Sequence, residues 1–252
     1  MYFEICDLSM LSIYFKEINA FFSSLIGYIA IIVFLMVTGL FVWVFPDTNV
    51  LDYGYASLHP LFFYAPWVFM FLIPAITMRS FAEEFSSGTI EFLSTKPLND
   101  YAIIIGKYLA AFTLVIFAIV PTLIYYISVY QLGAEVGNID SGGFWGSFIG
   151  LILLGAVFVS IGLFASSLTS NQIVSFIMAV FLCFIVFAAF DMLSRLDVFF
   201  ASLDVFVEQL GIQAHYESIS RGVLDTRDLV YFASVIGLFI IGTKTAIESR
   251  KW

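Results

Sequence analysis

The sequence predicts an all-α integral membrane protein with six spans and an interfacial helix near its N-terminus. Residues 141–190 form a run of 50 positions without Asp, Glu, Lys or Arg. About 20 apolar helical residues cross the hydrocarbon core of a bilayer, so this run holds two passes, with a turn at the polar cluster 166–172. The whole chain is 62% hydrophobic and 12% charged over 252 residues, which leaves little for a soluble domain.

The first element expected is an amphipathic helix over residues 11–26. Its apolar residues recur at helical spacing on one face, and they are Leu11, Tyr14, Phe15, Ile18, Phe22 and Leu25. Ser12, Lys16, Asn19 and Ser23 lie on the opposite face. This pattern is typical of a helix that lies in the membrane interface. A frayed extension of the first span is the alternative.

Hydropathy then predicts six spans, over residues 27–45, 61–78, 101–130, 144–168, 172–190 and 228–247. The last is the shortest in uncharged residues, and it spans if Lys244 extends toward the headgroups. We expect Asp225 to cap this helix and Asp228 to lie in its first turn, near the positive end of the helix dipole. Pro74 and Pro121 fall inside the second and third spans and should kink them.

Lysine and arginine side chains gather on the side of the two termini. That side carries Lys16, Arg79, Lys96, Lys107, Lys244, Arg250 and Lys251, against Arg195, Arg221 and Arg227 on the other. This asymmetry predicts cytoplasmic termini. On the outer side, segment 191–227 is too polar to span and too apolar for a free loop. We expect either a lid of short helices dipping into the interface or a packed loop that closes the outer end.

Signatures of enzymes are absent from the sequence. Gly106 and Lys107 lack the upstream glycine of a P-loop and are followed by Tyr108, so the chain has no ATP-hydrolysing loop of its own. His59 and His215 are far apart, and the two cysteines are also distant from one another. The net charge of −9 argues against nucleic acid as a partner. We therefore expect no catalytic, cofactor-binding or metal site.

Three glycines lead into the fourth predicted span. Gly142, Gly146 and Gly150 form two consecutive G-x-x-x-G steps. Such steps let helices approach one another closely in a membrane. We expect a helix-packing role for them.

The most informative segment for function follows the second span, at residues 78–97. Arg79 and Glu83 have the i, i+4 spacing that supports a helix. Gly88 and Thr89 should end that helix and cap a second one, which Pro97 ends. A helix, a turn and a helix would form a rigid protrusion. An ordinary interfacial loop is the alternative.

This segment resembles the signature of ABC-2-type permeases. In that signature an acidic cluster, Gly-Thr, a glutamate and a closing proline follow the second span, here Glu83, Glu84, Gly88, Thr89, Glu91 and Pro97. Residues 21–29, 65–67, 72–81, 160–164, 168–174 and 215–223 are similar to the gliding-motility, GldF-like subfamily. The resemblance implies a type V exporter-like bundle of six helices over residues 27–252, after an N-terminal region 1–26. It would have a coupling loop at 79–100 and an outer re-entrant segment at 191–227.

The resemblance also implies partners and a role. A separate ATP-binding subunit, which holds ATP and Mg, would dock on the coupling loop through Arg79, Glu83, Glu84, Gly88, Thr89 and Glu91. A second permease copy or a related membrane subunit would complete the membrane core, with membrane lipids and an auxiliary gliding-motility membrane protein beside it. The chain would then be a multi-pass permease subunit of the bacterial cytoplasmic (inner) membrane. Such permeases begin just before the amphipathic helix, so residues 1–9 look like an extension and Met10 is the expected start.

Two kinds of work remain open for such a subunit. It would couple ATP hydrolysis to substrate export or to conformational work in gliding motility. The alternatives are a structural anchor of a motility or secretion assembly, or an ABC-2 permease of another export or enzyme-maturation system. The sequence does not name a transported molecule.

Overall fold

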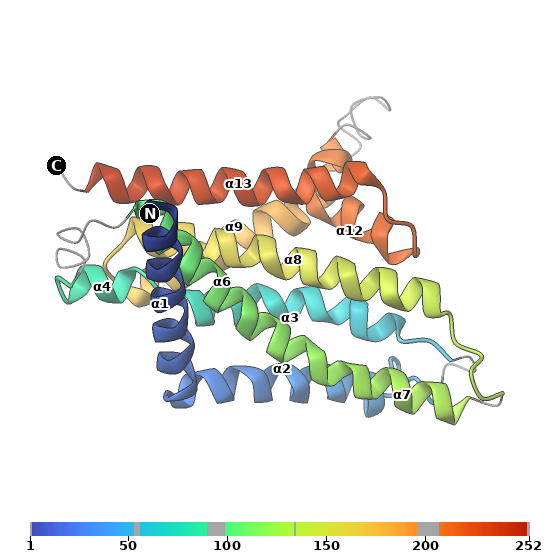
Figure 1. The fold of residues 1–252 in the computed structure, drawn as a ribbon. Coiled ribbons are helices and arrows are strands. Elements are labelled where there is room, and N and C mark those ends of the chain that lie inside the picture. The colour runs from blue at the N-terminus through green and yellow to red at the C-terminus, as the bar shows by residue number, and fades with distance from the viewer. Residues whose placement is uncertain (1, 53–55, 90–98, 134, 196–206, 251–252) are drawn as a thin grey trace.

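The computed structural model describes residues 2–52, 56–89, 99–133, 135–195 and 207–250. Long helices run side by side along one axis, and one helix crosses the end of this bundle (Figure 1). Both termini and α4 lie at one end, which we call the termini end, while α12 lies toward the other, the far end (Figure 1). This placement agrees with an even number of passes between the termini.

The crossing helix is α1 (Tyr2–Phe22), and it meets α2 (Leu25–Trp43) at a bend of 68°. The hydroxyls of Ser23 and Ser24 donate to carbonyl oxygens of the last turn of α1, which ends the helix there. The predicted boundary between interfacial helix and span was residue 26, so the break comes a few residues earlier. Residues 2–9 are continuous with α1.

The amphipathic pattern of α1 divides between two surroundings. Leu11 and Phe15, from the predicted apolar stripe, are 46% and 57% exposed. Ile13 and Phe21 are buried, and the methyl carbon Cγ2 of Ile13 lies against Gly106 of α6. Tyr14, Ile18 and Phe22 of the stripe also contact the bundle, so the stripe is divided between packed and outward-facing residues, and a position in the membrane interface stays a prediction.

Five helical stretches among the described residues have the length and hydropathy of a membrane span, or up to six when the bent pair α1–α2 counts as one. Their elements are α3 (His59–Thr77) with α4 (Ala82–Ser86); α6 (Asp100–Ile119) with η1 (Val120–Thr122) and α7 (Leu123–Leu132); α8 (Ser141–Leu168); α9 (Gln172–Phe184) with η2 (Ile185–Ala189) and α10 (Phe190–Ser194); and α13 (Thr226–Ser249). The all-α membrane bundle predicted from the sequence is confirmed.

Local signals explain several boundaries. Pro121 lies in the 3₁₀ turn η1 that separates α6 from α7, so the expected break in the third span is present. Pro74 lies inside the continuous helix α3, close to its end. Asp225 caps α13 by accepting a bond from the backbone N–H of Arg227, and Asp228 lies in the first turn, as predicted.

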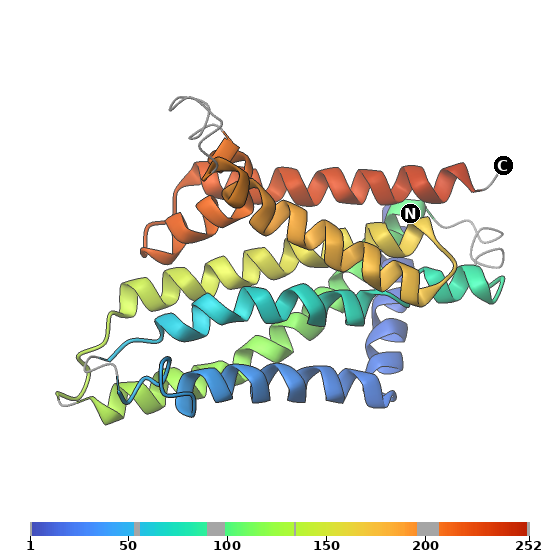
Figure 2. The same ribbon diagram turned by 180° about the vertical axis from the view of Figure 1, so that it is seen from behind.

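Helix α8 forms the centre of the bundle. Its apolar window is 78% buried, against 22% for α13, which packs along one side of it. Seen from behind, α9 runs beside α3, and both pack on α8 (Figure 2). Movements of α3 or α13 therefore bear directly on the central helix.

Candidate functional site

The chain that follows α3 is anchored to α8 by one buried serine. Ser166 Oγ accepts bonds from the backbone N–H groups of Phe81 (3.0 Å) and Ala82 (3.1 Å) and donates to the carbonyl oxygen of Met78 (3.1 Å). The first N–H groups of a helix have no partner within it, and α4 has no capping side chain of its own. Ser166 supplies the missing acceptor. We call residues 78–89 the α4 segment.

Lys107, on α6, joins the α4 segment to α1. Its Nζ donates to the carbonyl oxygen of Ser80 (2.7 Å), to Glu84 Oε1 (2.9 Å) and to Glu17 Oε1 (2.8 Å). Nζ also lies 5.2 Å from the centre of the Phe81 ring. A lysine ammonium has three N–H donors, and each has an acceptor here. Only 2% of the Lys107 side chain is exposed.

The Lys107 cluster, which we define as Lys107, Glu17, Glu84 and the nearby Lys16, is balanced in charge. Lys16 Nζ lies 3.4 Å from Glu84 Oε1, but its side chain is 63% exposed, so it contributes little. Lys107 is the essential cation because removing one partner of a buried ion pair leaves a charge uncompensated. Moving Glu84 away from Lys107 would therefore be costly.

The C-terminal end of α13 also holds the α4 segment. The guanidinium carbon of Arg250 lies 4.4 Å from the centre of the Phe85 ring, and Arg250 donates to the carbonyl oxygen of Leu168. Lys244 Nζ lies 4.6 Å from the ring centre of Tyr101, at the start of α6. Such cation–π contacts stabilise by about 0.5–1 kcal/mol at exposed sites. The α4 segment thus contacts α1, α6, α8 and the end of α13.

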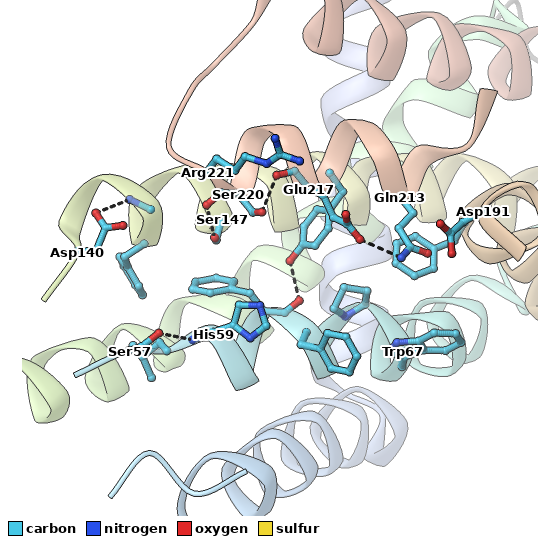
Figure 3. A pocket seen from close by; sticks show the side chains of 18 of the residues that line it. Ser57, His59, Trp67, Asp140, Ser147, Asp191, Gln213, Glu217, Ser220 and Arg221 are labelled. Atoms are coloured by element: carbon cyan, nitrogen blue, oxygen red, sulfur yellow. Dashed lines mark hydrogen bonds between the residues drawn. The ribbon is translucent and has the colours of Figure 1, made fainter. Parts of the chain in front are cut away.

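A cavity of about 740 Å³ opens at the far end, between α3, α8, α10 and α12 (Figure 3). Its α3 wall is mostly apolar and its α12 wall mostly polar. The residues that define the two walls are Phe62, Phe63, Pro66 and Trp67 on α3, and Gln213, Glu217, Ser220 and Arg221 on and after α12. A cavity with one apolar and one polar wall suits an amphipathic molecule.

The charged groups of this cavity are mostly engaged. Arg195 Nη2 lies 3.0 Å from Asp191 Oδ2, and Glu217 Oε1 accepts from Gln213 Nε2 at 3.0 Å. The guanidinium of Arg221 has no bonding partner among the residues that the structure describes. An acidic group on a bound molecule would find its counter-charge there.

Tyr216 fixes α12 to α3 across the inner end of the cavity. Its hydroxyl donates to the carbonyl oxygen of Phe62 at 2.8 Å. Burial raises the pKa of Tyr216, and the negative charge of Glu217 acts in the same direction. The phenol therefore stays protonated and keeps donating this bond in alkaline solution.

The glycine steps at the start of α8 lie against α12. A Cβ on Gly146 would overlap the backbone of Ile219 and Gly222, and one on Gly150 would lie 3.3 Å from the Tyr216 ring. A Cβ on Gly142 would meet only the side chain of Asp140, at 3.5 Å. Gly146 and Gly150 thus let the short helix α12, rather than another long helix, approach α8 closely.

The comparison with known families decides the class of this molecule. A sequence profile described as ABC-2 family transporter protein matches residues 46–203, well over half of the chain. The chain belongs to the ABC-2 transporter family. It is a multi-pass membrane permease subunit of an ABC transporter, and membership implies an ATP-binding subunit as its partner. No curated protein sequence matches the chain.

Four of the residues predicted to dock this ABC-2 permease on its ATPase lie at its surface. The Glu83 side chain is 57% exposed and that of Arg79 is 28% exposed, with 3.8 Å between Glu83 Oε2 and Arg79 Nε. Gly88 adopts a φ of +68° after the end of α4, and Thr89 Oγ1 lies 2.9 Å from Ser87 Oγ. Docking through these residues stays a prediction.

Of the other two predicted docking residues, Glu84 is mostly buried, and Glu91 is not among the described residues. Glu84 points inward to Lys107, and its side chain is 12% exposed. Its Oε2 is buried without a partner among the described residues. Glu91 lies outside the residues that the structure describes. Glu84 is thus placed to position the α4 segment inside the permease.

Sequence reasoning missed two residues of this ABC-2 permease that hold the α4 segment. Ser166 was seen only as part of a polar turn, and nothing in its neighbourhood indicates a bond to residues more than 80 positions earlier. Lys107 did carry a signal, because it is the sole charged residue of the predicted span 101–130. An ionisable residue within a span normally has a buried partner, here Glu84 and Glu17.

Proposed function

We propose that this permease receives the work of a separate ATPase at the outward surface of the α4 segment. In this proposal the Lys107 cluster carries the movement into α1 and α6. The observation that supports it is that one ammonium group bonds to both the α4 segment and α1. Lys107 Nζ contacts Ser80 and Glu84 of the α4 segment and Glu17 of α1 at 2.7–2.9 Å.

Displacement of the α4 segment would change the shape of the cavity at the far end. The segment continues directly from α3 and is bonded to α8 through Ser166. The same two helices reach the far end, where α3 carries Phe62 and α8 carries the glycines that face α12. Long helices transmit axial and tilting motions because their backbone bonds are internal. ATPase closure would thereby change the separation of the cavity walls.

The orientation that goes with this function places both termini in the cytoplasm of a bacterium, with the protein in its inner membrane. The excess of Lys and Arg on the termini side supports this orientation. A second permease copy, or a related membrane subunit, would complete the membrane core. The cavity would then open on the outer side.

The cavity supports a substrate class, and the resemblance supports a subfamily. An apolar α3 wall and the guanidinium of Arg221, which has no partner in the described part of the chain, suit an amphipathic molecule with an acidic group. Similarity to GldF-like permeases supports export, or conformational work, in gliding motility. The alternatives are a structural anchor, whose ATP turnover would not depend on solute, and an ABC-2 permease of another export or enzyme-maturation system. Solute-stimulated ATP turnover in proteoliposomes would favour export.

Charge reversal at the surface of the α4 segment tests the docking role. Glu83→Lys and, as a separate variant, Glu91→Lys should each abolish stimulation of the partner's ATPase in the reconstituted complex while membrane insertion persists. Glu135→Lys, at the far end, is the matched control and should leave stimulation unchanged. Full stimulation in both Glu83→Lys and Glu91→Lys would contradict the proposal. Glu84→Lys is less specific, because it would place another ammonium beside Lys107.

A further inference from the structure

His215, on α12 (Ile212–Ser220), lies between two hydrogen-bond acceptors. Its Nδ1 is 2.7 Å from Asp228 Oδ1 in the first turn of α13, and its Nε2 is 3.0 Å from the carbonyl oxygen of Gln209. The ring stacks on that of Tyr231, with centres 3.9 Å apart. The Tyr231 hydroxyl donates to the carbonyl oxygen of Leu210 at 2.6 Å. These contacts join the start of α12 to the start of α13.

The two acceptors determine how many protons this arrangement needs. A neutral imidazole has one N–H donor and one lone pair, so it cannot donate to both Asp228 and Gln209. Either His215 is an imidazolium beside a carboxylate, or Asp228 is a carboxylic acid that donates to Nδ1. Both states hold one proton more than a neutral histidine with a carboxylate.

We propose that His215 and Asp228 form a proton-binding site that locks α12 to the start of α13. Without the extra proton, a neutral His215 keeps one N–H, so a lone pair faces either Asp228 Oδ1 or the carbonyl oxygen of Gln209, and one of the two bonds is lost. Asp228 is 5% exposed, and its other oxygen has no partner among the described residues. A buried charge that loses its partner is strongly destabilising. Deprotonation would therefore weaken the contact between the two helices, because the Asp228 carboxylate is then buried without a counter-charge.

The lock affects the cavity because one face of α12 lines the cavity and the opposite face contacts α13. Gln213, Tyr216, Glu217 and Ser220 line the cavity, and their spacing of three, four and seven places them on one helix face. His215 lies on the opposite face, where it contacts Asp228 of α13. The proton site thus holds the back of the helix that forms the polar wall.

The other charged groups around α12 are accounted for. Neither α8 nor η2, which both contact α12, contains a titratable side chain. The titratable groups on the surrounding elements are His59 and Tyr64 on α3, Asp191 and Arg195 on α10, Tyr216 and Glu217 on α12, Glu208 and Arg221 beside its two ends, and Asp225, Arg227 and Tyr231 at the start of α13. Of these side-chain types, histidine is the one whose charge ordinarily changes between about pH 5 and 8. His59 is the other histidine of the chain, and it stacks on Phe63.

The sign of the effect follows from the proton count. The locked state holds the extra proton, so it is favoured at lower pH and lost as the pH rises. Hydrogen exchange of the full chain in lipid nanodiscs, read by mass spectrometry, measures the lock directly. After correction for intrinsic exchange, protection of the α12 amides should fall on the order of tenfold between about pH 6 and about pH 8. Protection in the middle of α8 should stay constant.

Two variants assign the effect, and one serves as the control. Asp228→Asn should remove the pH dependence, because its amide can donate to a neutral His215 whose Nε2–H still bonds to Gln209. His215→Gln should remove it as well. His59→Gln should retain the full pH dependence.

Equal protection of α12 at both pH values in the unmodified chain would overturn the proposal. So would a pH-dependent fall that persists in either Asp228→Asn or His215→Gln. The unmodified chain and two independent variants keep the test decisive if one variant does not fold. The measurement needs no ATPase, so its outcome is separate from that of the docking experiment.

Discussion

Replacement of Lys107 by methionine removes the ammonium and keeps an unbranched side chain of similar length. The Lys107→Met variant leaves Glu17 and Glu84 facing one another without the cation that both contact at 2.8–2.9 Å. Removing one partner of a buried pair costs about 3–5 kcal/mol. The two carboxylates retain 17% and 12% exposure, and Lys16 stays 3.4 Å from Glu84. We therefore expect the lower end of the range, about 3 kcal/mol of unfolding free energy.

The assay is unfolding by SDS in mixed micelles, followed by tryptophan fluorescence. Lys244→Met is the matched control, because Lys244 pairs with the half-exposed Glu248 and should cost less than about 1 kcal/mol. Adding Glu17→Gln and Glu84→Gln to Lys107→Met removes the stranded charges and should recover roughly half of the loss or more. A single variant as stable as the control, or a triple variant no better than the single, would refute the reasoning.

The remaining predictions concern packing and hydrogen bonds. In the same SDS assay, Gly146→Ala should destabilise the protein by about 2 kcal/mol, because its Cβ overlaps the backbone of α12. Gly142→Ala should change stability by less than about 0.5 kcal/mol. Similar losses for both variants would contradict the close approach of α12 to α8. Ser166→Ala should cost about 2 kcal/mol and lower ATPase stimulation, while Ser167→Ala, which loses a bond within α8 only, should preserve stimulation. Tyr216→Phe should cost about 1 kcal/mol, equally at about pH 6 and about pH 9, because burial raises the pKa of its phenol; a loss that disappears at the higher pH would show that the phenol ionises.

Hydropathy and local caps located most of the helices. The turn predicted at the polar cluster is present, since α8 ends at Leu168 and α9 begins at Gln172. Asp225 caps α13 as its position indicated. These features depend on residues within a few positions of one another. Membrane helices are also long and uniformly apolar, so their spans are legible in a single sequence.

Long-range contacts could not be predicted in the same way. Lys107 bonds to Glu17, 90 positions away, and Tyr216 to Phe62, 154 positions away. His215 and Asp228 looked unrelated because a loop separates their helices. The π-helical turn η2, which brings Phe187 and Ala188 to the cavity, has no proline or glycine to indicate it. Each of these depends on which helices become neighbours, and the hydropathy pattern does not specify that.

Photo-crosslinking detects directly whether an ATP-binding subunit docks on the outward surface of the α4 segment. A photoreactive amino acid in place of Glu83, whose side chain is 57% exposed, would lie on the exposed surface of α4 at the termini end. The same probe in place of Glu135 reports on the far end. We expect a covalent adduct between position 83 and an ATP-binding subunit, and none from position 135. An adduct from position 135, with none from position 83, would contradict it.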